Sequence, residues 1–404
     1  MDPLSAYIPQ DRYRALADRS DLPAAMAGTL LSADLVGFTP LTRGLVAQFG
    51  ERRGADVLSE VLNAVYTPCL QQITAYGGAV IGFSGDGFLG WFPADDGDRA
   101  ASCALRLQHM LPSILASLPA LPAAAALAMR VALAAGSVRR FIIGDPAVQL
   151  VDVLAGALLD RLAELDARCL PGEIVLDDSL AAGLERRGAL IRRRAAADEA
   201  VITLLSDLPR PAPPQPPAPP PALAEDVLRP WLLPQVFARL THGQGEFLTE
   251  LRPAVALFVR IHGLSADAPE APTILDRLLR MVQAVITPYE GNVLQVTIGE
   301  KGSYLYCGFG APLAHEDDAL RAVHTARALV EQAAALPGIG GVACGISQGI
   351  MRTGAYGGAD RRTYGVLGEA TNLAARLMQA ARPGQILLSE DLGTLGAVGI
   401  ALRS

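Results

Sequence analysis

The chain carries one passage twice. The first copy begins at Gly156 and the second at Gly368, with the sequences GALLDRLAELDARCLPGEIVL and GEATNLAARLMQAARPGQILL. Aligned without a gap, the copies share the opening glycine, a Pro-Gly pair and much of the apolar spacing. A repeat of a whole structural unit constrains the chain to two related domains.

The two copies differ at matched positions that could do chemistry. Asn372 and Arg376 stand where the first copy has Asp160 and Glu164. We therefore expect a paired architecture in which one cleft works and its mirror image has lost function.

Composition narrows the class of protein. A length of 404 residues, 51% of them hydrophobic, is enough for two domain cores. The net charge of -7 and the lack of a basic run longer than 192–194 argue against nucleic acid or an anionic membrane as partner. Five scattered cysteines without CxxC spacing indicate neither disulfides nor zinc. The sequence shows no secretory leader and no apolar run long enough to span a membrane. We therefore expect a cytoplasmic protein without a membrane partner.

A proline-rich segment, 209–221, divides the chain, because this composition extends as polyproline II and builds no core. The predicted parts are an N-terminal extension 1–26, a first domain 27–206, a linker 207–224 and a second domain 225–404. No counterpart of the closing strand of the first half, 200–205, appears in the second. We therefore expect a fragment of a longer protein, with regulatory domains beyond it.

Each half has the same predicted order of strand, helix, hairpin, helix, strand, helix and strand. This order predicts an α+β unit with a mostly antiparallel sheet and flanking helices. The predicted elements are 29–36, 41–75, 78–92, 99–117, 129–138, 156–170 and 173–176 in the first half, and 254–261, 275–289, 292–309, 319–335, 340–348, a helix from 369, and 385–389 in the second.

Two aspartates are candidate metal ligands. Asp34 ends an apolar strand in LLSADLVGFTPLT, and Asp86 lies in the hairpin turn of IGFSGDGFLGWF. Two carboxylates at one sheet edge suit Mg²⁺ ions that bridge phosphates. Each alone also fits a turn residue or a helix cap. Gly37, at the strand-to-helix turn that follows Asp34, either presents backbone N–H groups to phosphate or serves only the turn.

These motifs resemble the class III nucleotidyl cyclases, particularly the soluble adenylyl cyclases of the bicarbonate-responsive type with two catalytic domains on one chain. The strongest matches are ADLVGFT, FSGDGFLGWF, KGSYLYCGFG and YGVLGEATNLAARL, and the resemblance covers about 30–178 and 253–391. It implies two ferredoxin-like domains that form an intramolecular pseudodimer, and hence a functional monomer.

The resemblance also implies a role for each site residue. Asp34 and Asp86 would hold two Mg²⁺ or Mn²⁺ ions, and Arg130 would contact phosphate. The backbone that cradles the β and γ phosphates would be Leu35, Val36, Gly37, Phe38 and Thr39. From the second domain, Lys301 and the Val366 backbone would contact the purine, Asn372 would orient the ribose, and Arg376 would stabilise the charge that develops on the transferring phosphate.

Spacing and asymmetry support this division. Asn372 and Arg376 are four residues apart and so share a helix face, and the planar fork of arginine suits phosphate. A solvated helix face fits this pair equally well on its own. The second half has Arg260, Ser303 and Ala343 where the first has Asp34, Asp86 and Arg130, and the first half has Ser84 in place of Lys301. One interfacial site is therefore complete and its mirror image is not.

The implied reaction is conversion of ATP to 3′,5′-cyclic AMP and pyrophosphate by two-metal phosphoryl transfer. A guanylyl cyclase and a catalytically weak nucleotide-binding regulatory module are the alternatives. Gly365 stands where adenylyl cyclases often read the adenine amino group, so adenine preference rests mainly on Lys301, although Thr363 could substitute. Gly82 stands where bicarbonate-responsive relatives have a lysine, which argues against bicarbonate activation.

Overall fold

The computed structural model describes residues 3–118, 127–196, 199–205, 220–243, 249–299 and 302–392. The chain forms two compact units. Unit 1 comprises 1–140, 154–228 and 356–363, and unit 2 comprises 141–153, 229–355 and 364–404. The predicted linker falls largely on 206–219, outside the described residues.

Each unit contains a hairpin tip from the other half of the sequence. β4 (Ala128–Ile143) and β5 (Val151–Ala155) are joined by a turn that belongs to unit 2. β12 (Val342–Gly357) and β13 (Arg362–Leu367) are joined by a turn that belongs to unit 1. The two halves of the sequence therefore exchange equivalent segments.

Unit 1 is built on a sheet with the strand order β2-β3-β1-β4-β6-β8-β7, with β5 paired to β4. The β4–β6 pair is parallel, whereas β1 pairs antiparallel with both β3 and β4. The remaining strands are β1 (Ala25–Val36), β2 (Ala79–Ser84), β3 (Gly87–Pro93), β6 (Ile174–Leu176), β7 (Ile191–Ala196) and β8 (Glu199–Leu204).

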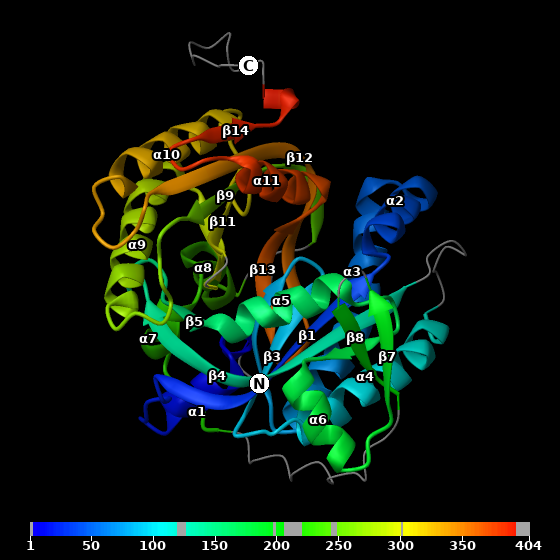
Figure 1. The fold of residues 1–404 in the computed structure, drawn as a ribbon. Coiled ribbons are helices and arrows are strands. Elements are labelled where there is room, and N and C mark those ends of the chain that lie inside the picture. Colours follow the sequence, from blue (N-terminus) through cyan, green and yellow to red (C-terminus); the bar gives the residue numbers. More distant parts are fainter. Residues whose placement is uncertain are drawn as a thin grey trace. The chain divides into compact units, whose positions relative to one another are not determined.

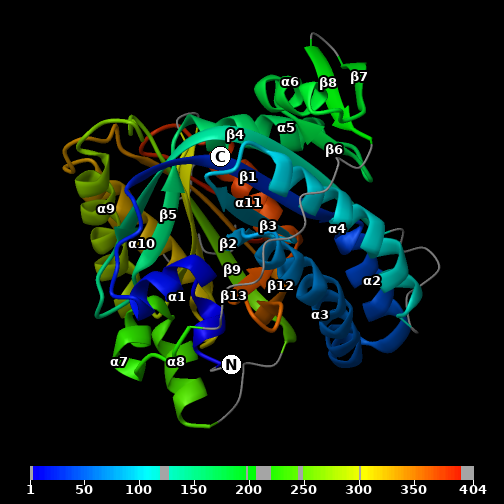
Figure 2. The same cartoon turned by 90° about the horizontal axis from the view of Figure 1, so that it is seen from below.

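Helices pack on this sheet, and α3 and α4 run side by side (Figure 2). The helical elements of unit 1 are η1 (Ser5–Tyr7), α1 (Gln10–Ala17), α2 (Phe38–Phe49), α3 (Glu51–Ala75), α4 (Asp98–Ala116), α5 (Ala157–Arg168), α6 (Asp178–Arg186) and α7 (Glu225–Leu228).

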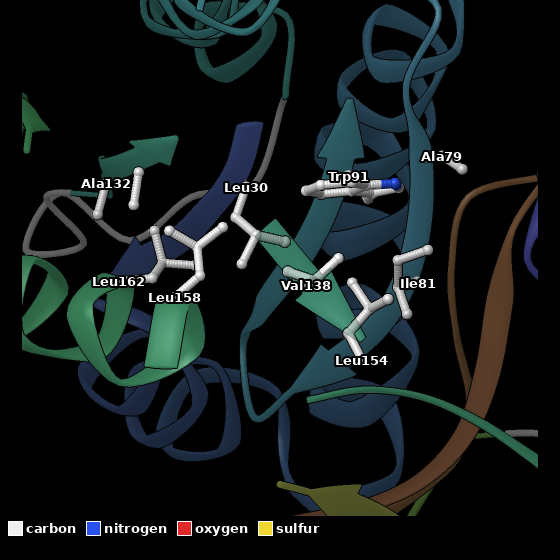
Figure 3. Packing of buried hydrophobic residues seen from close by; sticks show 10 residues of the cluster. Leu30, Ala79, Ile81, Trp91, Ala132, Val138, Leu154, Leu158 and Leu162 are labelled. Carbon is white, nitrogen blue, oxygen red and sulfur yellow. The ribbon is translucent and has the colours of Figure 1, made fainter. Parts of the chain in front are cut away.

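One hydrophobic cluster holds α5 against the sheet. Leu158 and Leu162 of α5 pack with Leu30 of β1, and Trp91 of β3 belongs to the same cluster (Figure 3). Leu30 and Trp91 are fully buried. Full burial of a leucine side chain stabilises by roughly 1.5 to 3 kcal/mol, so this cluster fixes β1, the strand that carries Asp34 near its end.

Unit 2 repeats the arrangement with the strand order β10-β11-β9-β12-β13, and β14 pairs parallel to β12. Its remaining strands are β9 (Glu250–Ile261), β10 (Asn292–Thr297), β11 (Ser303–Phe309) and β14 (Ile386–Leu388). Its helical elements are η2 (Arg229–Trp231), α8 (Pro234–Thr241), α9 (Ala271–Ile286), η3 (Thr287–Tyr289), α10 (Asp318–Ala333) and α11 (Glu369–Ala380). α9 and α10 lie side by side (Figure 1).

The predicted α+β class is confirmed, with some differences in the elements. The expected helix 41–75 is two helices, because Gly50 adopts a φ of 78° between α2 and α3. The strand expected over 340–348 continues to Gly357, and α1, α6, α8, β7 and β13 were not predicted. Within the described ranges, no helix combines the length and the apolar character needed to cross a bilayer.

Candidate active site

Asp34 lies where three neighbouring strands meet. Near the end of β1, it pairs in register with Gly87 of β3 on one side and with Arg130 of β4 on the other. The alternation of β1 leaves Ala33 and Leu35 buried and Asp34 partly exposed. The strand pairing therefore brings three positions far apart in sequence to one sheet edge.

Asp86 lies in the two-residue loop that joins β2 to β3. Gly85 has a φ of 59°, which suits the glycine at the first position of a type II′ turn. The Asp86 carbonyl accepts hydrogen bonds from the Leu35 backbone N–H at 3.4 Å and from the Tyr66 hydroxyl at 2.9 Å. The turn is thus tied both to the end of β1 and to α3.

Gly87 keeps the space beside Asp34 open. A Cβ atom at this position would lie 2.9 Å from the Ala33 carbonyl oxygen and 3.3 Å from Oδ1 of Asp34. Any larger residue would crowd the Asp34 carboxylate. This steric limit explains why a glycine follows Asp86.

The two carboxyl groups interact directly. Burial raises the pKa of Asp86 from 3.8 to about 7, and the negative charge of Asp34 and a hydrogen bond with it contribute further. Two adjacent carboxylates repel each other, and a hard cation between them relieves that repulsion. The donor set therefore fits divalent metal ions.

Arg130 bridges two acidic side chains. Its guanidinium lies 2.6 Å from Oδ2 of Asp34 and 3.4 Å from Oδ2 of Asp166 on α5. Burial also raises the pKa of Asp166. Asp166 was not predicted from the sequence, because helix–sheet packing, which no motif shows, brings it to Arg130.

A metal ion at this edge would need ligands from its substrate. Among the described residues, no group of three or more His, Cys, Asp or Glu side chains could hold a metal ion. Mg²⁺ commonly uses one or two carboxylates together with substrate phosphate oxygens. Asp34 and Asp86 fit that coordination.

The backbone after Asp34 forms a helix N-terminus. Gly37 is the N-cap of α2 with a φ of 96°, and the helix begins at Phe38. The first N–H groups of a helix have no partner within it and carry a partial positive charge. The predicted phosphate cradle is thus next to the carboxyl pair, although the Leu35 N–H is already bonded to Asp86.

The remaining described candidates lie in unit 2. Asn372 and Arg376 are exposed on α11, which sits very close to β12. A Cβ on Gly345 of β12 would lie 2.2 Å from the Ala374 carbonyl oxygen. Val366 is fully buried in β13, and its carbonyl accepts a hydrogen bond of 2.7 Å from the Tyr306 hydroxyl.

The asymmetry between the halves is visible in the strand register. Arg260 of β9 pairs with Ala343 of β12, as Asp34 pairs with Arg130 in unit 1. Ser303 begins β11 and donates a hydrogen bond to the Gly299 carbonyl at 2.8 Å. The described strands of unit 2 therefore carry no carboxylate at these matched positions. Lys301 lies outside the described residues.

Comparison with known proteins finds relatives by sequence. No family model matches. "Adenylate cyclase type 10" of Homo sapiens is 23% identical over 394 residues, which cover 87% of this chain and 24% of that protein. The protein of the same name from Rattus norvegicus is 22% identical over 387 residues, with the same shares. The chain thus spans about a quarter of the length of the curated relatives it matches.

Among solved structures, a "Class III adenylyl cyclase-like ATP-binding protein" from Pseudomonas aeruginosa superimposes with a TM-score of 0.61 and 13% identity. The match covers 95% of this chain and 92% of that one, so the fold is shared along nearly the whole chain. The chain is therefore similar in sequence to these adenylate cyclases and shares its fold with a class III adenylyl cyclase-like protein.

The structure brings Asp34, Asp86 and Arg130 together at one sheet edge. It places Val366, Asn372 and Arg376 on two successive elements of the other unit.

Proposed function

We propose that this chain is an adenylyl cyclase that converts ATP to 3′,5′-cyclic AMP and pyrophosphate. The observation that carries the proposal is the Asp34–Asp86 carboxyl pair at the N-terminus of α2. The similarity to proteins named adenylate cyclase type 10 supports the choice of reaction.

Asp34 and Asp86 would hold two divalent metal ions, either Mg²⁺ or Mn²⁺. Such ions, when bound, neutralise phosphate charge and make the ribose 3′ hydroxyl more acidic. The N–H groups at the start of α2 would bind the β and γ phosphates. Arg130 would contact a phosphate, since its guanidinium already lies beside Asp34.

The exposed residues of α11 would complete the site. Arg376 would stabilise the charge that develops on the α phosphate, because its guanidinium can donate two hydrogen bonds at once. Asn372, one helical turn earlier, would hold the ribose. Both groups of residues are on one chain, so a monomer would suffice.

Purine choice would rest on Lys301 and the Val366 backbone. Gly365 is buried and has no side chain to read a base. ATP is preferred over GTP in the proposal because the curated relatives are named adenylate cyclases.

A second candidate is a module that binds a nucleotide without cyclising it. The contact of Arg130 with Asp34 favours it, because a guanidinium occupies one carboxylate that a metal ion would need. The similar structure from Pseudomonas aeruginosa is described as an ATP-binding protein.

Product analysis separates the two candidates. The purified chain is incubated with ATP or GTP and Mg²⁺ or Mn²⁺, and cyclic nucleotide and pyrophosphate are measured. Asp34→Asn should lower the rate at least about a hundredfold. Asp18→Asn, at the exposed C-cap of α1, is the matched control and should leave it unchanged.

Cyclic AMP that is lost in Asp34→Asn and kept in Asp18→Asn supports the adenylyl cyclase. Cyclic GMP in excess supports a guanylyl cyclase. Binding of both nucleotides without any product supports the binding module.

A further inference from the structure

The tip of the β12–β13 hairpin, Tyr356–Thr363, comes from the second half of the sequence but belongs to unit 1. It comprises the end of β12, the turn and the start of β13, and it precedes Val366 and α11 in the sequence. It contacts β2 and α3, the two elements that also fix the Asp86 turn, and it contacts η1 and α1 as well.

Arg361 anchors the tip. It is 5% exposed, and its guanidinium donates hydrogen bonds to the carbonyls of Val80 and Ile81 at 3.1 and 3.0 Å. It also donates to the Ala6 carbonyl at 3.4 Å. Val80 and Ile81 lie at a bulge, where the pairing of β2 with β3 shifts register.

A bulge leaves backbone groups without their ladder partners, and buried carbonyls need another donor. Arginine can serve several carbonyls at once because it has five N–H donors in a fixed plane. Arg361 therefore satisfies the irregular part of β2, four residues before the turn begins.

Aromatic contacts continue from this anchor to the turn. The Arg361 guanidinium lies 5.5 Å from the centre of the Phe83 ring, and the Tyr356 ring lies 5.4 Å from the same ring. Tyr66 of α3 packs against both rings, with centroid distances of 6.2 and 6.3 Å. Its hydroxyl donates to the Asp86 carbonyl.

Two glycines allow the tip to approach this closely. A Cβ on Gly357, which has a φ of 118°, would lie 2.9 Å from the Phe83 ring. A Cβ on Gly358 would lie 3.0 Å from Cα of Thr67 on α3. The tip thus packs on the strand and the helix that hold the turn.

We propose that Arg361 and Tyr356 are positioning residues for the Asp86 turn. A hairpin tip from the second half of the sequence sets the geometry of a metal-binding carboxylate in the first half. The inference rests on the proposed function only in that Asp86 holds a metal ion.

The test measures Mn²⁺ binding without turnover. Binding of Mn²⁺ in the presence of an ATP analogue that cannot cyclise is followed by calorimetry. Hydrogen exchange of the backbone amides at 85–88 is measured in parallel. Neither readout depends on whether the wild type forms cyclic AMP, so failure of the proposed reaction and failure of this inference are distinguishable.

Arg361→Lys should weaken Mn²⁺ binding about tenfold, as loss of a group that orients a metal ligand does. It should also speed exchange in the turn. Arg99→Lys is the matched control, since Arg99 donates to the carbonyls of Tyr76 and Gly77 at the opposite end of β2. It should change neither readout.

Tyr66→Phe isolates the last contact and keeps the ring. Removal of one hydrogen bond to the Asp86 carbonyl should weaken Mn²⁺ binding roughly three- to tenfold. Wild-type Mn²⁺ affinity and turn exchange in Tyr66→Phe, or in a folded Arg361→Lys, would overturn the proposal.

Discussion

Replacement of Asp86 by asparagine should change how the stability of the metal-free chain depends on pH. Burial and the adjacent Asp34 raise the pKa of Asp86 from 3.8 to about 7. The folded state therefore holds this proton more tightly than the unfolded state does. The stabilisation of the folded state by protonated Asp86 is fully present below about pH 4 and is lost as the pH rises through about 7.

The size of this pH-dependent contribution to the free energy of unfolding follows from the shift in the pKa of Asp86. A change from 3.8 to about 7 corresponds in full to roughly 4 kcal/mol, of which more than half falls between pH 5 and pH 8. Because Asp34 and Asp86 titrate together, this free energy belongs to the pair. Asp86→Asn should remove most of it.

Tryptophan fluorescence can report on unit 1 alone. The chain has two tryptophans, and Trp91 is fully buried in β3, the strand that follows the turn. In a Trp231→Phe background, urea unfolding with a chelator present would be followed at pH 5 and pH 8, with and without Asp86→Asn.

The free energy of unfolding of the wild type should fall between pH 5 and pH 8. In the Asp86→Asn variant this fall should be smaller by about 2 kcal/mol. Equal pH dependence in the two proteins would refute the argument that the carboxyl pair is held together in the metal-free state.

Other changes test neighbouring parts of the account. Asp166→Asn should weaken Mn²⁺ binding roughly threefold or more, because Arg130 loses one of its two carboxylate partners and then pairs more strongly with Asp34. Calorimetry measures the Mn²⁺ affinity, and an unchanged affinity would exclude a role for Asp166. Gly345→Ala should destabilise unit 2 by about 1 to 3 kcal/mol, because its Cβ would meet the backbone of α11 at 2.2 Å. Urea unfolding followed through Trp231 tests it, with Gly302→Ala, which has open space, as control; equal stability of the two variants would contradict the packing argument.

The parts that the sequence predicted share a physical cause. The strand that carries Asp34 near its end and the turn at Asp86 depend on local apolar alternation and on glycines with special backbone angles. Such signals act over a few residues, so a single sequence displays them. Because the passage is repeated, the same order of elements could be predicted for the second half of the sequence.

The parts that were missed depend on long-range packing. Asp166 reaches Arg130 only because α5 lies on the sheet, and the hydrophobic residues that place α5 are common to many helices. Arg361 satisfies carbonyls of Val80 and Ile81, which are far away in sequence. No local pattern marks an arginine in a hairpin turn as an internal anchor.

The exchange of hairpin tips has a similar origin. β13 was not predicted, because its sequence, RTYGVL, is short and contains a glycine. Pairing with β12 supplies its stability. Strand propensity alone does not reveal such pairing.

The central claim is that residues of both halves of the chain act on one nucleotide. The most direct test is the rate of cyclic AMP formation by Arg376→Ala, measured beside Arg382→Ala. Arg382 is an exposed arginine just beyond the end of α11. The account predicts at least about a hundredfold loss of rate in Arg376→Ala with little change in ATP binding, and a wild-type rate in Arg382→Ala. Equal rates in both variants would contradict it.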